Sequence, residues 1–427
     1  MSNKSKGARF MQLEGLRGLA ALIVVFHHFL YFFYPALRSG DMSLAHTRFE
    51  DNLYDTPMLL IFHGTLAVAV FFVLSGFVLS IGYFKSKDEN VVKKLAASRY
   101  LRLMLPALAS VLIAFSLMSF GVGSLTKDAG DIAGSSNLSK KLNFDTNIVD
   151  TVKTGVLDIF VEGKAESKGV PLNNVLWTMH PEFMGSFLVF AFLLLFAKSR
   201  YRLVAYVALL FATFGTWFLG FIIGMMIADA YSQGWLKKLQ KPLTVAGLTI
   251  LGLFFAVYPK DTTGTIYQYI DTSVFGVSGR IFYLTIAAAL IVLVVLLSKN
   301  ATKYLQKPLF SRLGRYTFSL YLTHLFVIYT VSSAVVINLH DVIGYNKSIL
   351  VAALVSLPVF WIVTVLFEKY IDAPSIKFAK YVGAAFRGEV EVDWSKHRGL
   401  VIKKTKGLFR RKGQVVDTKD DQSDHAP

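Results

Sequence analysis

The chain contains no cysteine, and charged residues make up only 17% of its 427 residues. The absence of cysteine excludes disulfide bonds, thiolate metal sites and a cysteine nucleophile. Apolar side chains are correspondingly abundant, because 54% of the residues are hydrophobic and 14% are aromatic. A soluble protein of this length needs a more polar surface. The composition therefore predicts an integral membrane protein.

Negative charge is scarcer than positive charge, since 28 Asp and Glu residues stand against 45 Lys and Arg residues and leave a net charge of +17. Such an excess can indicate nucleic-acid binding. In a membrane protein it more often reflects Lys and Arg gathered in cytoplasmic loops beside anionic lipid. We therefore expect the lipid bilayer, and no nucleic acid, among the partners.

Long apolar runs recur along the chain, each long enough to cross a hydrocarbon core of about 30 Å as a helix. They predict an all-α, polytopic membrane helix bundle of about ten transmembrane helices, near residues 15–35, 60–84, 103–120, 175–197, 203–214, 216–231, 243–258, 281–298, 317–337 and 348–369. The fifth and sixth runs flank Gly215, so they form either a tight hairpin or one broken helix. Ten spans with both termini cytoplasmic place most Lys and Arg residues on the inner side, which favours the hairpin.

The same pattern divides the chain into a membrane domain and a tail. The membrane domain is predicted to cover residues 1–380, and residues 121–174 form a polar outer loop within it. This loop is long enough to act as a small lid over the outer mouth of the bundle. Residues 381–427 are basic and polar, and they predict a disordered cytoplasmic tail.

Ionisable side chains in the first apolar run are the first candidates for a functional site. Arg17 and His28 are eleven residues apart, so they lie on one face of a helix with about 16 Å between them along its axis. Arg17 lies near the cytoplasm and His28 lies deeper, toward the outer half. A structural interpretation makes Arg17 an end anchor and His28 a buried residue satisfied by a neighbour, but ionisable groups at that depth are costly unless they are used. With these charges and no cleavage site after it, the run is not expected to be a signal peptide.

The fourth apolar run opens with a cluster of polar and aromatic residues that includes Trp177, His180 and Glu182. This run enters from the outside, which puts Glu182 at a depth comparable to that of His28. A carboxylate at that depth can orient an imidazole, so His28 and Glu182 form a candidate pair of base and orienting group. The alternative is an interfacial anchor made of Trp, His and Glu.

Two arginines lie where the third apolar run begins. Arg99 and Arg102 are one helical turn apart, and together they could clamp a phosphate at the cytoplasmic mouth. Positive-inside anchoring explains them equally well. His324 at mid-depth in the ninth run and Asp372 just past the tenth would complete a path of polar groups from the cytoplasm to the outer face. No metal site is expected.

Six ordered motifs between residues 10 and 380 resemble the acyltransferase 3 family of membrane O-acyltransferases. They are Leu13-Glu14-Gly15-Leu16-Arg17-Gly18-Leu19-Ala20-Ala21 with His28, Phe71-Phe72-Val73-Leu74-Ser75-Gly76-Phe77, Arg99-x-x-Arg102 with Pro106, Trp177-Thr178 through Glu182, Ser319-Leu320-Tyr321-Leu322-Thr323-His324, and Asp372-Ala373-Pro374. The sequence departs from the family pattern in two places, where His180-Pro181 replaces the commoner Ser-Val and Asp372 replaces Glu. These departures bear on the acceptor side more than on the chemistry.

The resemblance implies transfer of an acyl group, usually acetyl, from cytoplasmic acyl-CoA to a sugar hydroxyl on the outer side. The resemblance implies that the CoA phosphates are bound by Arg17, Arg99 and Arg102. The catalytic pair would be His28 and Glu182. The substrate path would be lined by Ser75, Trp177, His180 and His324. Acetyl-CoA would be a co-substrate, and no permanently bound cofactor is implied. The acceptor would be a polysaccharide or a lipid-linked glycan, and the location the bacterial cytoplasmic membrane.

A transporter is the main alternative from another functional class. The same His, Glu and Arg residues could serve a proton-coupled membrane transporter of an acyl or sugar compound. Against it stand the lack of an internal repeat and the pairing of arginines at phosphate spacing. A non-catalytic sensor or scaffold is a third interpretation, for which the sequence offers no specific feature.

Overall fold

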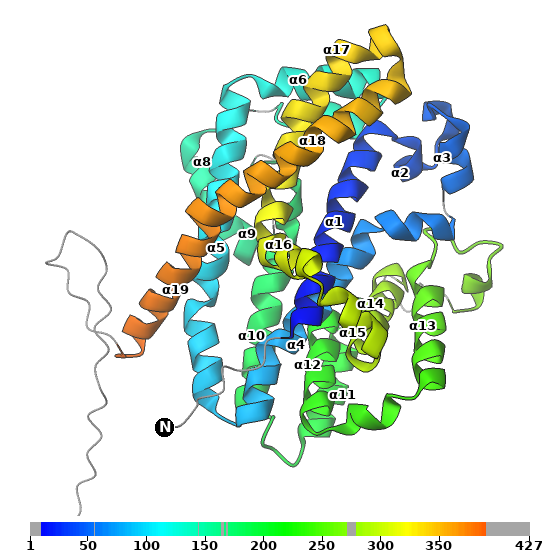
Figure 1. Ribbon diagram of the computed structural model, residues 1–427. Coiled ribbons are helices and arrows are strands. Elements are labelled where there is room, and N and C mark those ends of the chain that lie inside the picture. Colours follow the sequence, from blue (N-terminus) through cyan, green and yellow to red (C-terminus); the bar gives the residue numbers. More distant parts are fainter. Residues whose placement is uncertain are drawn as a thin grey trace, which may run out of the picture.

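The computed structural model describes residues 10–54, 56–143, 145–163, 166–167, 170–270 and 279–389, and helices dominate this part of the chain (Figure 1). The expected all-α class is confirmed, apart from one short antiparallel pair of strands, β1 (Glu166–Ser167) and β2 (Val170–Pro171). The predicted tail falls largely on residues 390–427, which lie outside the described residues.

Seven helical stretches within the described residues are long and apolar enough to cross a membrane. They are α1 (Met11–Phe33), α4 (Gly64–Ser86), α5 (Glu89–Ser119), the 3₁₀ helix Asn174–Thr178 with α10 (Met179–Leu195), α14 (Gly279–Leu297), α16 (Pro308–Val327) with α17 (Ser333–Ile343), and α18 (Tyr345–Phe367) with α19 (Ala373–Phe386). The last two stretches each contain a π-helical segment, Ile328–Ser332 and Glu368–Asp372. The protein is therefore a polytopic, integral membrane protein.

Three shorter apolar helices, α11 (Arg202–Ala212), α12 (Phe218–Ser232) and α13 (Pro242–Ala256), lie where the fifth, sixth and seventh spans are expected. The turn between α11 and α12 contains Gly215 with φ of +69°, a left-handed conformation that suits glycine. The two segments are thus separate helices and not one broken helix. That all three cross the membrane remains a prediction.

The segment 121–174 is folded, with several short helical elements. These are α6 (Val122–Ile132), α7 (Ser136–Ser139), α8 (Ile148–Lys153), the π-helical segment Thr154–Asp158 and α9 (Ile159–Val161). The first of them packs against α17, and the later ones pack against α5 and α10. Tyr100 on α5 donates a hydrogen bond to the carbonyl of Val156, which ties this segment to the bundle.

The remaining elements connect the long helices. They are α2 (Ala36–Ser39), α3 (Arg48–Leu53), α15 (Lys299–Leu305) and the 3₁₀ helices Met42–Leu44, Pro57–Phe62, Trp235–Leu239 and Ile266–Ile270. Tyr34, just past α1, donates a hydrogen bond to the side chain of Asn346 at the start of α18, so the end of α1 is held against that helix.

Helix α5 differs from its sequence-based prediction at its start. The apolar run suggests a beginning near residue 103, but the helix begins at Glu89, where the Asp88 side chain accepts a hydrogen bond from the Asn90 amide. Arg99 and Arg102 therefore lie ten and thirteen residues after the first residue of the helix; their position at the cytoplasmic mouth of the span stays a prediction. A window that counts apolar residues misses the polar first turns of such a helix.

Glycines let the central helices approach closely. A Cβ at Gly224 on α12 would lie 2.0 Å from the Val73 carbonyl oxygen on α4, and one at Gly76 would lie 2.1 Å from the Phe221 carbonyl oxygen. Gly18 on α1 meets Gly314 on α16 in the same way. Small residues at such crossings maximise packing between membrane helices. The crossings fix α1, α4, α12 and α16 relative to one another, and three of these four helices line the candidate site.

Helix α18 continues through the π-helical segment into α19 and crosses the face of the bundle (orange in Figure 1). Its first part packs on α16 and α17, and α19 packs on α5. Helix α19 ends at Phe386, so the first residues of the predicted tail, from 381, are helical. The oblique path brings Glu368 and Asp372 over the cavity described below.

Candidate functional site

A large cavity of about 720 Å³ lies among α1, α4, α5, α10, α16 and the α18–α19 helix. Its lining is unusually rich in charge for the interior of a membrane bundle. It contains the basic residues Arg17, Arg99, Arg102, Arg315 and Lys380 and the acidic residues Glu14, Glu182, Glu368 and Asp372. Ionisable side chains inside a membrane protein are costly and normally mark a functional site. We refer to this space as the arginine cavity.

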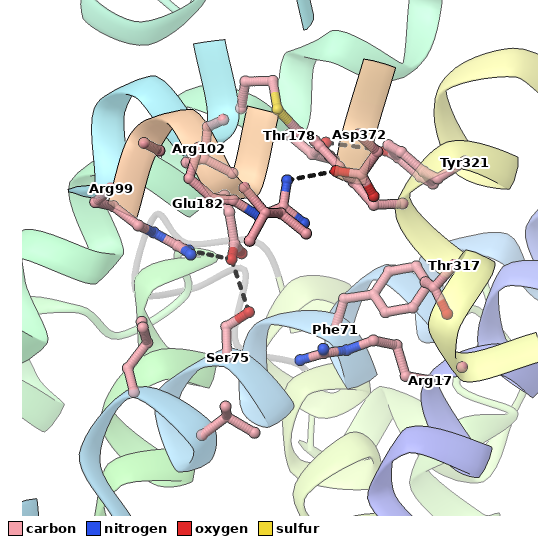
Figure 2. A pocket seen from close by; sticks show the side chains of 18 of the residues that line it. Arg17, Phe71, Ser75, Arg99, Arg102, Thr178, Glu182, Thr317, Tyr321 and Asp372 are labelled. Carbon is pink, nitrogen blue, oxygen red and sulfur yellow. Dashed lines mark hydrogen bonds and ion pairs between the residues drawn. The ribbon is translucent and has the colours of Figure 1, made fainter. Parts of the chain in front are cut away.

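Glu182 holds the arginine cavity together on one side. Figure 2 shows Arg99 and Ser75 converging on its carboxylate. The Nη2 of Arg99 and the Oγ of Ser75 both donate to Glu182 Oε1, at 2.5 and 2.8 Å, and Arg99 Nε also donates to Ser186 Oγ at 2.8 Å. Residues from α4, α5 and α10 are thus tied at one carboxylate, and the Arg99 guanidinium is held in a defined orientation.

Asp372 holds a second arginine. Arg102 Nη1 lies 2.6 Å from Asp372 Oδ1, and the aspartate side chain is 4% exposed whereas the arginine side chain is 27% exposed. Glu368 pairs in turn with Arg315 at 2.9 Å. Both acids belong to the π-helical segment Glu368–Asp372, and such segments are frequent at functional sites. Because the two acids are four residues apart, they lie on the same side of the helix and line the same cavity.

Arg17 and Lys380 differ from the other basic residues of the arginine cavity. Among the residues that the structure describes, no carboxylate lies within ion-pair distance of either. In Figure 2 the Arg17 side chain extends into the cavity beneath Phe71, on the side opposite Arg99. A guanidinium without a bound carboxylate keeps its donors for an anionic ligand. Arg17 is therefore the arginine best placed to bind phosphate directly.

A second, smaller cavity of about 200 Å³ contains the candidate base. Its lining includes His28, His27, Asn137, Asn174 and Trp177, and it also includes Arg38 and Tyr31. Asn137 belongs to α7 and Asn174 follows β2, so the segment 121–174 lines part of this cavity. We refer to this space as the histidine cavity.

The hydrogen bonds of His28 define which of its nitrogens can accept a proton. His324 Nδ1 faces the Leu320 carbonyl at 3.1 Å, and His28 Nδ1 faces both the Val24 carbonyl at 3.0 Å and His324 Nε2 at 3.2 Å. A carbonyl only accepts, so each Nδ1 must carry hydrogen. When both rings are neutral, the single Nδ1–H of His28 is shared between the Val24 carbonyl and His324 Nε2, which both accept it. His28 Nε2 is left with a lone pair, as a general base requires.

The two cavities are stacked along the same structural elements. Helices α1, α4 and α16 and the segment 174–182 line both of them. On α1, Arg17 lies in the arginine cavity and His28 lies in the histidine cavity, about 16 Å further along the axis at 1.5 Å per residue. Val68 and Tyr321 line both cavities and mark their boundary. A cavity lined by several arginines thus adjoins a cavity that contains His28.

A family model described as an acyltransferase domain matches residues 11–368, which is most of the chain. The chain belongs to the acyltransferase 3 family. The matched range contains Arg17, His28, Glu182 and His324, and it ends at Glu368, just before Asp372. No curated protein and no solved structure matches the chain.

As a member of the acyltransferase 3 family, the protein is a membrane acyltransferase, and this activity favours an enzyme over a transporter. The structure brings Arg17, Arg99, Arg102, Ser75 and Glu182 into one cavity. It does not join Glu182 to His28 as the sequence suggested: Glu182 bonds Arg99 and Ser75, and the side-chain partner of His28 is His324. The reason is that Glu182 on α10 points toward Arg99 on α5. The depth of a residue along its helix does not show the direction in which its side chain points.

Two of the expected substrate-path residues occupy different surroundings in this acyltransferase. Trp177 lines the histidine cavity and packs against Trp217, with ring centroids 5.5 Å apart. His180 lines neither cavity; its Nδ1 lies 2.8 Å from the Phe160 carbonyl, so it anchors α9 instead. The ion pair of Arg315 and Glu368 was not anticipated, although two opposite charges at the ends of neighbouring apolar runs were a signal for it.

The acyltransferase should depend more on Arg102 than on Asp372 for stability. Arg102→Ala leaves the 4% exposed Asp372 carboxylate without its partner and should cost about 3 kcal/mol of unfolding free energy. Asp372→Asn leaves the more exposed Arg102 without its carboxylate partner and should lower the free energy of unfolding by about 1 kcal/mol. Thermal unfolding of the purified protein in detergent measures both. Lys198→Ala, which breaks an exposed pair with Glu89, is the control and should cost less than about 1 kcal/mol. Equal losses for the first two variants would contradict this account.

Proposed function

We propose that the protein transfers an acyl group, most readily acetyl, from cytoplasmic acyl-CoA to a hydroxyl of a cell-surface or secreted carbohydrate. The observation that carries the proposal is the stacking of the arginine cavity and the histidine cavity along the same elements. In this proposal both termini are cytoplasmic, the protein lies in the bacterial cytoplasmic membrane, and the arginine cavity opens to the inside.

The donor binds with its phosphates in the arginine cavity. Arg17 and Lys380 carry charge that no carboxylate within the described ranges neutralises by an ion pair, and Arg102 uses one Nη for Asp372. These groups match the several negative charges of a CoA nucleotide. The paired acids serve a different purpose, because they hold Arg99 and Arg102 in place before the donor arrives, which lowers the entropic cost of binding.

His28 acts as the general base on the acceptor hydroxyl. The hydroxyl proton moves to His28 Nε2 while the oxygen attacks the thioester carbonyl carbon. The carbon–sulfur bond then breaks, and the departing thiolate takes a proton to give free CoA thiol and an O-acyl ester. Through its hydrogen bond to His28 Nδ1, His324 holds the tautomer in which Nε2 accepts. Glu182 therefore acts on the donor side by positioning Arg99, and His324 takes the orienting role.

The acceptor enters the histidine cavity from the outer side. The polar side chains there include two amides and three basic residues, namely Asn137, Asn174, Arg38, His27 and His28. Amide side chains offer both donors and acceptors to hydroxyl groups. Trp177 adds an aromatic face at the edge of the cavity. This combination suits a carbohydrate, and a polysaccharide or a lipid-linked glycan both present such hydroxyls outside the membrane.

Release of free CoA thiol tests this function. Purified protein should release CoA from acetyl-CoA when a crude envelope-glycan fraction is added, and the acetyl group should appear on the glycan. Because the transfer is direct, no acyl-enzyme should accumulate when acetyl-CoA is given alone. Thiol release that ignores the glycan, or transport of a sugar without any CoA release, would refute the proposal. A labelled acyl-histidine trapped without acceptor would refute the direct route only.

A further inference from the structure

Two side chains are shared by the arginine cavity and the histidine cavity. Val68 on α4 and Tyr321 on α16 line both cavities, and they are 7% and 6% exposed. Every other lining residue belongs to one cavity alone. These two residues therefore mark the place where the two cavities are closest to each other.

The Tyr321 side chain is fixed in position. Its hydroxyl donates to the Val175 carbonyl at 2.9 Å and lies 2.9 Å from Thr178 Oγ1. Both partners belong to the 3₁₀ helix Asn174–Thr178, and this helix is tied to α16 a second time because Asn173 Nδ2 donates to the Leu322 carbonyl at 2.9 Å. Phe71 packs edge-on against the Tyr321 ring, with centroids 6.0 Å apart. A side chain held at its ring and at its hydroxyl forms a rigid wall.

Val68 lines both cavities from a helix that is also held in position. Helix α4 is held against α12 by the close crossing at Gly76 and Gly224. A short, branched valine has little freedom within a helix. Both shared residues thus belong to helices and not to a loop.

We propose that Val68 and Tyr321 form a constriction that selects the acyl group by size. The inference rests on the proposed function, because the thioester must reach His28 while the CoA phosphates stay with Arg17, about 16 Å away along α1. The phosphates are too strongly charged to leave the arginines for an apolar gap. The thin end of the donor therefore passes Val68 and Tyr321, and a short acyl chain such as acetyl passes most easily.

Changing the size of residue 68 tests the constriction. In Val68→Ala, the ratio of the butyryl-CoA rate to the acetyl-CoA rate should rise about tenfold, since one or two methyl groups in an apolar passage carry discrimination of this order. In Val68→Phe, acyl transfer should fall at least about a hundredfold with every donor, while the Kd for CoA itself stays within about threefold. The rates are measured as glycan-dependent thiol release, and the Kd by titration with CoA.

A matched control separates the passage from general packing. Val70 lies on the same helix, is 4% exposed and lines neither cavity, so Val70→Ala should leave the butyryl-to-acetyl ratio unchanged. An unchanged ratio in Val68→Ala, or a wild-type rate in folded Val68→Phe, would overturn the constriction. If Val68→Phe does not fold, the ratio in Val68→Ala decides. Failure of the wild type to transfer any acyl group would instead refute the proposed function.

Discussion

His28→Ala should lose at least about a hundredfold in the rate of acyl transfer while it still binds acetyl-CoA, because a positioned general base contributes a factor of this order. The residue removed lines the histidine cavity, and its hydrogen bonds at Nδ1 leave Nε2 with a lone pair. Donor binding should survive, since the arginines that we assign to it lie in the other cavity. The measurement is glycan-dependent thiol release at saturating acetyl-CoA, with the Kd for CoA titrated in parallel.

A second histidine provides the control for this result. His340 lies on α17, lines neither cavity and contacts Asp341, so His340→Ala should transfer acyl groups at the wild-type rate. The rate of acyl transfer by His324→Ala should lie between the rates of His28→Ala and His340→Ala. This substitution removes the group that holds the His28 tautomer and leaves His28 itself in place. Full activity in His28→Ala would remove His28 from the mechanism.

Arg17→Gln should raise the KM for acetyl-CoA about tenfold to a hundredfold and change kcat little. A charge-assisted contact between guanidinium and phosphate is worth about 1.5–3 kcal/mol, which corresponds to that range. Arg17 should matter more than Arg315, whose guanidinium is engaged by Glu368 at 2.9 Å. The KM of the wild type should also rise with salt, and this dependence should weaken in the variant because one screened contact has been lost.

Arg312→Gln is the matched control for this prediction. Arg312 lies on α16, is exposed and is absent from the lining of both cavities. Its replacement removes the same charge from the protein without changing the arginine cavity. An equal rise in KM for both variants would mean that Arg17 acts through the overall charge of the protein and not through contact with the donor.

The helices themselves were largely predictable from the sequence, because each apolar run must satisfy its backbone hydrogen bonds internally within a bilayer. The start of helix α5 was not predictable in this way. The polar residues from Glu89 to Arg102 do not register in a window of hydropathy, yet the Asp88 cap and continued packing against α19 make them helical. Arg99 and Arg102 lie in this polar first part of the helix and line the arginine cavity.

Pairings within the site were less predictable than depths. His28 and Glu182 were expected to meet because their helices place them at comparable depth, but depth does not specify the side of the bundle toward which each residue points. Glu182 meets Arg99, and His28 meets His324, a residue 296 positions away in the chain. Helix rotation about its axis is set by crossings such as that of Gly18 with Gly314, and these contacts cannot be assigned from one sequence.

The central claim is that one route through the two stacked cavities carries the acyl group from a donor on one side of the membrane to an acceptor on the other. Proteoliposomes that contain a soluble envelope-glycan fraction only in their lumen, with radiolabelled acetyl-CoA only outside, test it directly. We expect labelled acetyl on the lumenal glycan and free CoA outside, and we expect no label on the glycan with His28→Ala. Label on glycan added to the outside, with none on lumenal glycan, would contradict a route across the bundle.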